Sequence, residues 1–205
     1  MKTIATIALI ATALTVAAQE TVQIGSQVWM KHNLNVGEMI LSPAKQTDNG
    51  VIEKYCYANN PDNCSVYGGL YSWNEAMQYA TNPKGICPDG FHIPSQAEVT
   101  TLYTYLGGIL VAGGKLKETG TEHFRGFTKP FNIGATNSTG FTALPGGMAW
   151  HTGAFYYLKV DANFWTSTTV IPNVANYFGM MYSTPSATNG EYYKAVSLSI
   201  RCIKD

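Results

Sequence analysis

The sequence predicts an α+β fold in which two short helices and a small twisted antiparallel β-sheet are connected by long loops. Three observations carry this prediction. Two capping boxes each begin a stretch with apolar residues at helical spacing. The second half of the chain alternates β-like segments with Gly, Pro and Asn. Neither helix is long enough to be stable alone, so both must pack against the β-rich remainder.

The helices are predicted within residues 67–106. Each starts at an S-x-x-E capping box, formed by Ser72 with Glu75 and by Ser95 with Glu98. The apolar stripes that follow are Trp73, Ala76, Met77 and Ala80, then Val99, Leu102, Tyr103 and Leu106. The first helix is expected to end at Asn82-Pro83, because proline lacks an N–H, and the second at Gly107-Gly108.

The strands are predicted from alternation and turn signals. Residues 21–30 are expected to form a hairpin around Gly25-Ser26, a pair suited to a type II′ turn. Residues 107–141 are expected to be loops with one short helix near 114–118. The later strand candidates are 142–150, 155–158, 163–170, 175–182 and 192–203. In the last of these, Cys202 shares a face with the apolar residues Val196, Leu198 and Ile200, which suits a buried disulfide.

Composition limits the classes of function. The formal net charge is zero and 13% of the residues are charged. Without a basic excess, the chain is not expected to bind nucleic acid or an anionic membrane surface. The 13 Tyr, 4 Trp and 20 Gly instead indicate a loop-rich extracellular module that uses aromatic side chains in place of charges.

Residues 1–18 have the pattern of a secretory signal peptide. Lys2 is the positive start, residues 4–14 are the apolar run, and Val16-Ala17-Ala18 offers small residues for cleavage before Gln19. An N-terminal strand or core helix is the alternative. The run is shorter than the ~20 residues of a membrane span. We therefore expect a secreted protein (extracellular, at the cell surface or in the periplasm), with residues 19–205 as a single domain.

All four cysteines follow the predicted signal peptide. An even number in a secreted chain indicates two disulfides, and three pairings are open. Cys56 and Cys64 bracket a tight loop, which favours a local bridge, and Cys87 and Cys202 would then close a long loop. Free buried thiols are the alternative. A metal site is less favoured, because the chain has no C-x-x-C and no histidine at a ligand spacing from a cysteine.

Several ordered pieces of the chain resemble known proteins. W-x-x-A at 73–76, Cys87, G-x-H-x-P at 90–94 and E-x-x-x-L at 98–102 resemble the two-helix half of the C-type lectin-like fold. In that fold a cysteine near the first helix pairs with one in the final strand, and Cys87 and Cys202 match this arrangement. The resemblance thus implies a C-type lectin-like domain.

A closer resemblance, over nearly all of the mature chain, is to the Fibrobacter succinogenes major paralogous domain family of secreted bacterial proteins. Its pieces are VWM at 28–30 with NLN at 33–35, YGxLYxW at 67–73, CPxGFHIP at 87–94, GFxALPGG at 140–147, FWTST at 164–168 and SIRCIKD at 199–205. This resemblance implies the fold and the compartment. It implies no ligand, because the molecular role of the family is poorly defined.

The chain departs from the sugar-binding C-type lectins at their Ca²⁺ site. Those proteins hold Ca²⁺ with E-P-N or Q-P-D and W-N-D tripeptides, none of which occurs here. A hard cation takes about 6–8 oxygen ligands. Asp161, Asn163 and Glu191 are scattered oxygen donors for which solvated loops are the simpler interpretation. We expect no Ca²⁺-dependent sugar site, no metal and no cofactor.

The sequence does not predict a catalytic centre. His32, His92, His123 and His151 are candidate bases, but no G-x-S-x-G motif supplies a nucleophile. We interpret His92 as a hydrogen-bonded structural residue. Glu118 and Glu122 imitate a glycosidase pair, yet Gly120 interrupts a helix there, so solvated acids are expected. The formylglycine-generating enzymes share the broad fold but rely on reactive cysteines. Because all four cysteines of this chain are expected to form disulfides, the chain is predicted not to be an enzyme, and an enzyme on that scaffold is the third hypothesis.

The candidate ligand-binding residues are aromatic. Trp150, His151, Tyr156 and Tyr157 lie among glycines in residues 146–157, and such side chains offer flat apolar faces with a polar handle for stacking on sugar rings. Core packing is the alternative, and it is the one expected for Phe164, Trp165 and Phe178. We predict a binding or adhesion module of a bacterial surface, whose partner is a glycan or a cell-surface protein. A structural subunit of a surface assembly is the second hypothesis, and the oligomeric state stays open.

Overall fold

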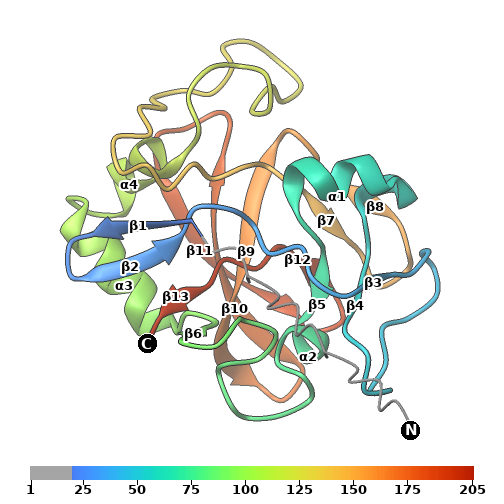
Figure 1. Cartoon of the computed structure of the whole chain (residues 1–205). Coiled ribbons are helices and arrows are strands. Elements are labelled where there is room, and N and C mark those ends of the chain that lie inside the picture. Colours follow the sequence, from blue (N-terminus) through green and yellow to red (C-terminus); the bar gives the residue numbers. More distant parts are fainter. Residues whose placement is uncertain (1–19) are drawn as a thin grey trace, which may run out of the picture.

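The computed structural model describes residues 20–205, so the predicted signal peptide at 1–18 lies outside the described part. The fold is mixed α/β, with small, mostly antiparallel sheets (Figure 1). The described chain contains four α-helices and one 3₁₀ turn at Tyr57–Asn59. The helices are α1 (Pro61–Tyr67), α2 (Trp73–Ala76), α3 (Gln96–Tyr105) and α4 (Ile109–Leu116).

Three sheets and one short parallel pair organise the strands. The first sheet has the order β1 (Thr21–Ile24), β2 (Gln27–Met30), β13 (Ile203–Lys204), β6 (Phe91–His92). The second has the order β11 (Ala187–Tyr193), β10 (Val174–Met181), β9 (Asp161–Ile171). The third has the order β5 (Tyr71–Ser72), β12 (Ser197–Leu198), β7 (Met148–Ala149), β8 (Phe155–Tyr156). The parallel pair is β3 (Glu38–Met39) with β4 (Glu53–Lys54).

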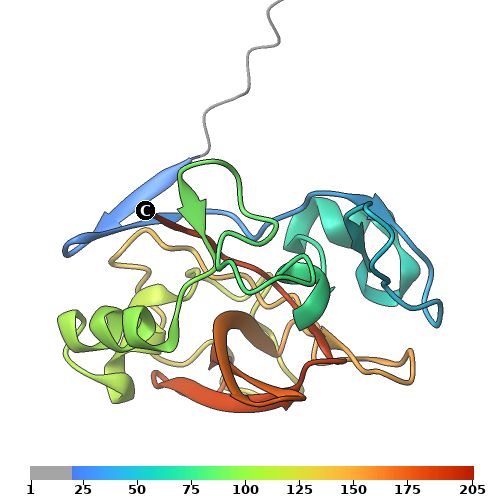
Figure 2. The same ribbon diagram turned by 90° about the horizontal axis from the view of Figure 1, so that it is seen from below.

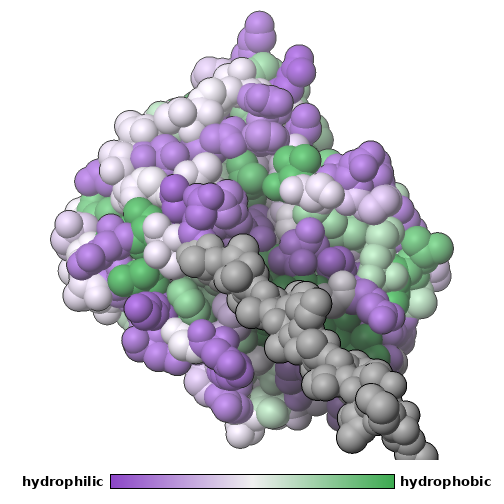
Figure 3. All heavy atoms as spheres, viewed as in Figure 1, coloured by the Kyte–Doolittle hydropathy of each residue, from purple (hydrophilic) through white to green (hydrophobic). Residues whose placement is uncertain are grey.

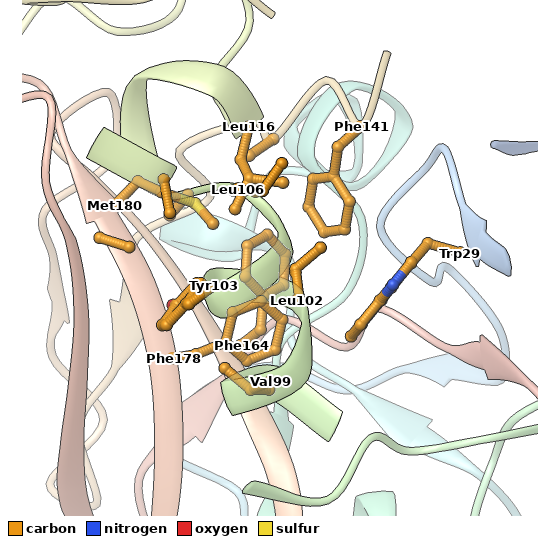
Figure 4. Close-up of a cluster of buried hydrophobic side chains, with 14 of the residues drawn as sticks. Trp29, Val99, Leu102, Tyr103, Leu106, Leu116, Phe141, Phe164, Phe178 and Met180 are labelled. Atoms are coloured by element: carbon orange, nitrogen blue, oxygen red, sulfur yellow. The ribbon is translucent and has the colours of Figure 1, made fainter. Parts of the chain in front are cut away.

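The sheets lie on opposite sides of the core. Figure 2 shows β1, β2 and β6 on one side, the β9–β10–β11 sheet on the other, and α3 with α4 at one end. Trp29 of β2 packs edge-on against Phe141 and Phe178, with ring centroids 5.7 and 6.1 Å apart. The predicted stripe of α3 points into this cluster, where Leu102 and Tyr103 lie against the aromatic rings (Figure 4).

The predicted hairpin at 21–30 is confirmed. Gly25 has a φ of 62°, the left-handed conformation that a Gly-X turn requires. The predicted start of α3 is also confirmed. The hydroxyl of Ser95 accepts from the Glu98 N–H, and the Glu98 carboxylate accepts from the Ser95 N–H, which completes the capping box.

The first predicted helix is wrong in length. It ends at Ala76, because Gln78 and Tyr79 both take a left-handed φ of 53°. The chain turns back here, and the Ala76 carbonyl accepts from the Ile86 N–H at 2.9 Å. A tertiary contact therefore ends the helix seven residues before Pro83 could do so.

Two helices and several strands also differ from the prediction. Helix α1 was not predicted, although Asn60 caps it and Pro61 opens it. Helix α4 lies at Ile109–Leu116, earlier than the short helix expected near 114–118. The expected strand at 192–203 is broken into the end of β11, β12 and β13, and that at 142–150 is strand only at 148–149. These segments form short strands that pair in three different sheets, and no local sequence pattern encodes such pairings.

Both predicted disulfides are confirmed. Cys56 pairs with Cys64, and Cys87 pairs with Cys202, which lies in the buried cluster with Val196, Leu198 and Ile200. Disulfides of this kind are typical of proteins that fold in an oxidising compartment. None of the helices in residues 20–205 has the length and apolar composition needed to span a bilayer.

Arg201 is buried on the opposite face of the same terminal segment. Its guanidinium is 0% exposed and donates to the carbonyl oxygens of Met30, Lys31 and Phe141 at 3.1, 2.9 and 2.6 Å. It also donates to the side-chain oxygen of Asn33. Burial lowers the pKa of Arg201 to about 9. The alternating pattern places Arg201 away from the apolar face, but the structure encloses that second face as well.

Candidate functional site

A cleft of about 550 Å³ opens beside the third sheet. Its lining includes Ser197 of β12 and Ser72 of β5, which pair with each other in that sheet. Its walls come from loops far apart in sequence, and its aromatic lining consists of Tyr55, Tyr79, Trp150, His151 and Tyr193. We call this site the aromatic cleft.

The β7–β8 turn places Trp150 at the wall of the aromatic cleft. The Trp150 N–H donates to the Ala154 carbonyl at 2.7 Å, and the Gly153 N–H donates to the Trp150 carbonyl at 2.8 Å. Gly153 has a φ of 95°, and a Cβ there would lie 2.8 Å from side-chain atoms of Pro43 and Ser42. The turn and the loop at residues 42–46 therefore pack closely enough to require glycine.

Trp150 differs from the other three tryptophans in its indole N–H. Trp73 donates to the Thr166 carbonyl at 2.8 Å, Trp165 to the Tyr71 carbonyl at 3.0 Å, and Trp29 to the Gln27 side chain at 3.4 Å. The indole N–H of Trp150 has no acceptor among residues 20–205, although its ring packs against His151 and Tyr192. Because indole nitrogen is a donor only, this half-buried side chain can offer one hydrogen bond to a ligand.

Tyr79 enters the lining of the aromatic cleft from a turn with left-handed backbone conformation. Tyr79 keeps its left-handed φ while its hydroxyl donates to the Glu75 carboxylate at 3.0 Å. Glu75 is 0% exposed, and its carboxylate also accepts from the Glu53 N–H at 2.9 Å. Burial raises the pKa of both Tyr79 and Glu75. A non-glycine residue held in this region of φ costs about 1–3 kcal/mol, so the fold expends stability to place the ring.

The polar groups of the aromatic cleft divide into engaged and available ones. Gln46 is engaged, because it donates to the Leu70 carbonyl and accepts from the Ser72 N–H. The side-chain amides of Asn74 and Asn173 make no hydrogen bond within residues 20–205, and both are exposed. Lys194 lies over the Trp73 ring, 3.8 Å from its centroid. The available groups are thus aromatic side chains, amides and the cations of Lys45 and Lys194.

The structure separates the four predicted binding residues. Trp150 and His151 line the aromatic cleft, with ring centroids 5.3 Å apart. Tyr156 and Tyr157 pack on each other at 6.0 Å and lie outside its lining. Along a strand such as β8, alternate residues face opposite sides, so sequence neighbours do not share a surface.

Three aromatic residues of the aromatic cleft were not predicted: Tyr55, Tyr79 and Tyr193. Each lies next to a segment whose turn or pairing only the tertiary structure defines. Tyr193 ends β11, whereas the sequence predicts it near the start of a strand at 192–203. The signal available in the sequence was the abundance of tyrosine beside Pro, Asn and Gly, which does not select individual residues.

The other candidates have structural partners. His92 lies 2.7 Å from the Asp205 carboxylate and 2.8 Å from that of Glu98. Burial alone would lower the pKa of His92, but the two carboxylates raise it above its ordinary value. His123 lies 2.8 Å from Glu118, so Glu118 is a paired acid and not the solvated one expected.

Thiol chemistry has no free cysteine to use, because all four are paired. Among residues 20–205, His, Cys, Asp and Glu side chains nowhere gather in a group of three or more suited to a metal ion. The face shown in Figure 3 intersperses hydrophilic residues with small hydrophobic patches.

Comparison with known proteins gives one match. The model of a family described as the Fibrobacter succinogenes major domain matches residues 22–204. No curated protein and no solved structure matches the chain.

Proposed function

Because the chain belongs to the Fibrobacter succinogenes major domain family, we propose its function from the geometry of its own aromatic cleft. The protein is a secreted, non-enzymatic binding module of a bacterial surface, and its ligand is a glycan held without Ca²⁺. A volume of about 550 Å³ is within the range of small-molecule sites and accommodates a few sugar residues.

One observation carries this proposal: Trp150 is a half-buried tryptophan in the lining of the aromatic cleft, and its indole N–H has no acceptor within residues 20–205. A sugar ring presents C–H groups to an aromatic face and hydroxyls to amides and donors. The cleft offers both kinds of partner, with Trp150 and Tyr193 beside the free amides of Asn74 and Asn173.

The C-type lectin-like fold and export belong to the same proposal. The Cys87–Cys202 bridge joins the segment between α2 and α3 to the C-terminal segment, as in that fold. Two disulfides and the signal-like pattern of residues 1–18 support export. Adhesion through a glycan of a neighbouring cell or matrix follows if the protein stays at the surface.

A glycan array followed by calorimetric titration of the best ligand tests the proposal. Trp150→Ala is expected to weaken binding at least about ten-fold, equivalent to about 1.4 kcal/mol. Trp150→Phe keeps a ring but removes the N–H, so an intermediate loss is expected. A metal chelator should leave the affinity unchanged.

Tyr156→Ala is the matched control, because Tyr156 is an exposed aromatic residue (45%) outside the lining of the aromatic cleft. Equal affinity of Trp150→Ala and Tyr156→Ala would exclude the cleft as the binding site. Binding that disappears with the chelator would exclude the metal-free mode.

A specific observation favours a second candidate, a structural subunit of a surface assembly. Four large apolar side chains are exposed together around the α3–α4 junction: Tyr105 at 65%, Ile109 at 38%, Leu110 at 72% and Val111 at 42%. Such a group is typical of a protein–protein contact. Size-exclusion chromatography with light scattering decides: a higher oligomer that Leu110→Asp converts to a monomer supports assembly, and a wild-type monomer argues against it.

A further inference from the structure

A second cavity, of about 620 Å³, lies over the three-stranded sheet, and we call it the Asp161 pocket. Its floor follows from the strand register. Asn163 of β9 pairs with Gly179 of β10, which pairs with Thr188 of β11, so these residues share one face. Asp161 lies two residues before Asn163 and therefore on the same face.

Glycines shape the floor of the Asp161 pocket. A Cβ on Gly190 would lie 2.5 Å from the Tyr177 ring, so glycine lets that ring lie against the sheet. Tyr177 in turn stacks on Tyr192, with ring centroids 4.7 Å apart and planes 22° from parallel. Tyr157 enters the lining from a turn in which it holds a φ of 65°. With Tyr182, four tyrosines thus line the pocket.

Asp161 is the one carboxylate in the lining, and it lacks a partner. Its Oδ1 atom is buried and accepts no hydrogen bond within residues 20–205. Burial raises the pKa of Asp161 to about 6. The pKa of Tyr192 is raised to about 12, mainly by burial and in addition by the neighbouring Tyr177 and Asp161. The titratable groups that face the carboxylate are therefore tyrosine hydroxyls, which are neutral at pH 7.

The nearby buried cation is already saturated. Lys117 is 0% exposed, and its ammonium donates to the carbonyls of Ile133, Met181 and Thr184 at 2.9, 3.0 and 2.8 Å. An ammonium has three N–H donors, so none remains for Asp161. Lys117 instead holds the segment at 181–184 that forms one side of the Asp161 pocket.

We propose that the Asp161 pocket binds a protonated primary amine, with the ammonium donating to Asp161 between the tyrosine faces. A buried charge without a partner is costly, and an organic cation offsets this cost while its alkyl part packs on the aromatic wall. One carboxylate among tyrosines falls short of the oxygen set of a hard cation, which takes about 6–8 ligands. The amine belongs either to an amino sugar or to a lysine side chain.

Titration followed by NMR of the Asp161 carboxyl carbon tests this inference. Two amine probes are glucosamine and Nα-acetyl-lysine methylamide, and their neutral counterparts are N-acetylglucosamine and Nα,Nε-diacetyl-lysine methylamide. We expect at least one amine to lower the pKa of Asp161 by about one pH unit or more, since a cation stabilises the ionised form. Its neutral counterpart should leave this pKa unchanged. The probe that binds identifies the source.

Two test variants and two control variants show whether the amine binds in the Asp161 pocket. Asp161→Asn should weaken amine binding at least ten-fold, as judged from shifts of the tyrosine ring signals. Gly190→Ala should also weaken it, because the added methyl displaces Tyr177, whereas Asp48→Asn, at an exposed carboxylate outside the lining, should not. Amine binding here does not use the amides of the aromatic cleft, so Asn74→Ala, at an exposed residue of the cleft lining outside the Asp161 pocket, should leave it unchanged.

Equal binding of amines and acetylated counterparts, or an Asp161 titration that neither amine moves, would overturn the inference. The wild-type titration needs no variant to fold, so it decides the matter if Asp161→Asn is unstable.

Discussion

Replacing Arg201 by methionine removes the guanidinium that connects the terminal segment to β2, to the loop after it and to the loop at residue 141. The replacement has a similar volume and is apolar, so it leaves no large cavity. What is lost is the set of donors to three carbonyl oxygens and the Asn33 side chain. These acceptors lose a charged donor, and a buried acceptor left without a partner is destabilising.

The magnitude follows from two opposing contributions. Four hydrogen bonds from a charged donor are worth roughly 6–12 kcal/mol at about 1.5–3 kcal/mol each. Burial of the charge works against them, and the lowering of the Arg201 pKa to about 9 corresponds to about 5 kcal/mol. The difference is about 1–7 kcal/mol, with ~4 kcal/mol at its centre, and this range includes the ~3–5 kcal/mol lost when one partner of a buried charged group is removed. We therefore expect Arg201→Met to lower the free energy of unfolding by ~4 kcal/mol.

Urea denaturation with the disulfides intact, monitored by tryptophan fluorescence, measures this loss, because Trp29 and Trp165 are fully buried in the folded state. The matched control is Arg125→Met, at the other arginine of the chain, which is exposed. It should change stability by less than about 0.5 kcal/mol. Arg201→Lys keeps the charge but not the planar fork, so it should lie between the two. If Arg201→Met were as stable as Arg125→Met, the assignment of Arg201 as the central polar contact of the core would be wrong.

Three further predictions concern stability. Because the pKa of His92 is raised on folding, its contribution to stability is complete below about pH 6.5 and is lost as the pH rises through the pKa of the folded state. Because the pKa of Glu98 is lowered on folding, its contribution is lost as the pH falls below about 4.5. Urea midpoints from pH 4 to 9 should therefore decline above about pH 6.5 in the wild type and less steeply in His92→Gln; parallel curves would contradict this. Gly113→Ala should lower the free energy of unfolding by ~2–3 kcal/mol, because its Cβ would lie 2.2 Å from the Ser186 carbonyl oxygen. Val111→Ala, on the exposed side of α4, is the control, and equal melting temperatures of the two variants would refute the clash. Replacing Cys87 and Cys202 together by serine should cost more than replacing Cys56 and Cys64, because the longer loop, with a separation of 115 against 8 residues, gains more entropy in the unfolded chain; the reverse order in calorimetry would contradict the loop-length argument.

The predictions from local signals were the most accurate. The capping box at Ser95 defines the start of α3 because its hydrogen bonds join residues three positions apart. The hairpin around Gly25 depends on one positive φ, which glycine adopts without strain. The pairing of Cys87 with Cys202 followed once the short loop from Cys56 to Cys64 had taken the other two cysteines.

The predictions that depended on distant contacts were less accurate. Helix α2 ends early because its last carbonyl bonds to Ile86 across a loop. The candidate binding residues were chosen as neighbours in sequence, yet Trp150 lies with Tyr55, Tyr79 and Tyr193, which reach the aromatic cleft from other loops. Asp161 was considered only as a scattered oxygen donor until the register of β9 and β10 placed it under stacked tyrosines.

The amino-acid sequence by itself indicated the family and the cysteine pairing and determined where α2, α3 and the first hairpin begin, because each depends on a few neighbouring residues or on a short list of cysteines. Only the tertiary structure decided which aromatic rings face one another, which charges are enclosed and where the two cavities lie. Those features arise where loops separated by as many as 150 positions pack together, as Pro43 and Tyr193 do at the aromatic cleft. Their geometry comes from packing the whole chain, and no local pattern carries it.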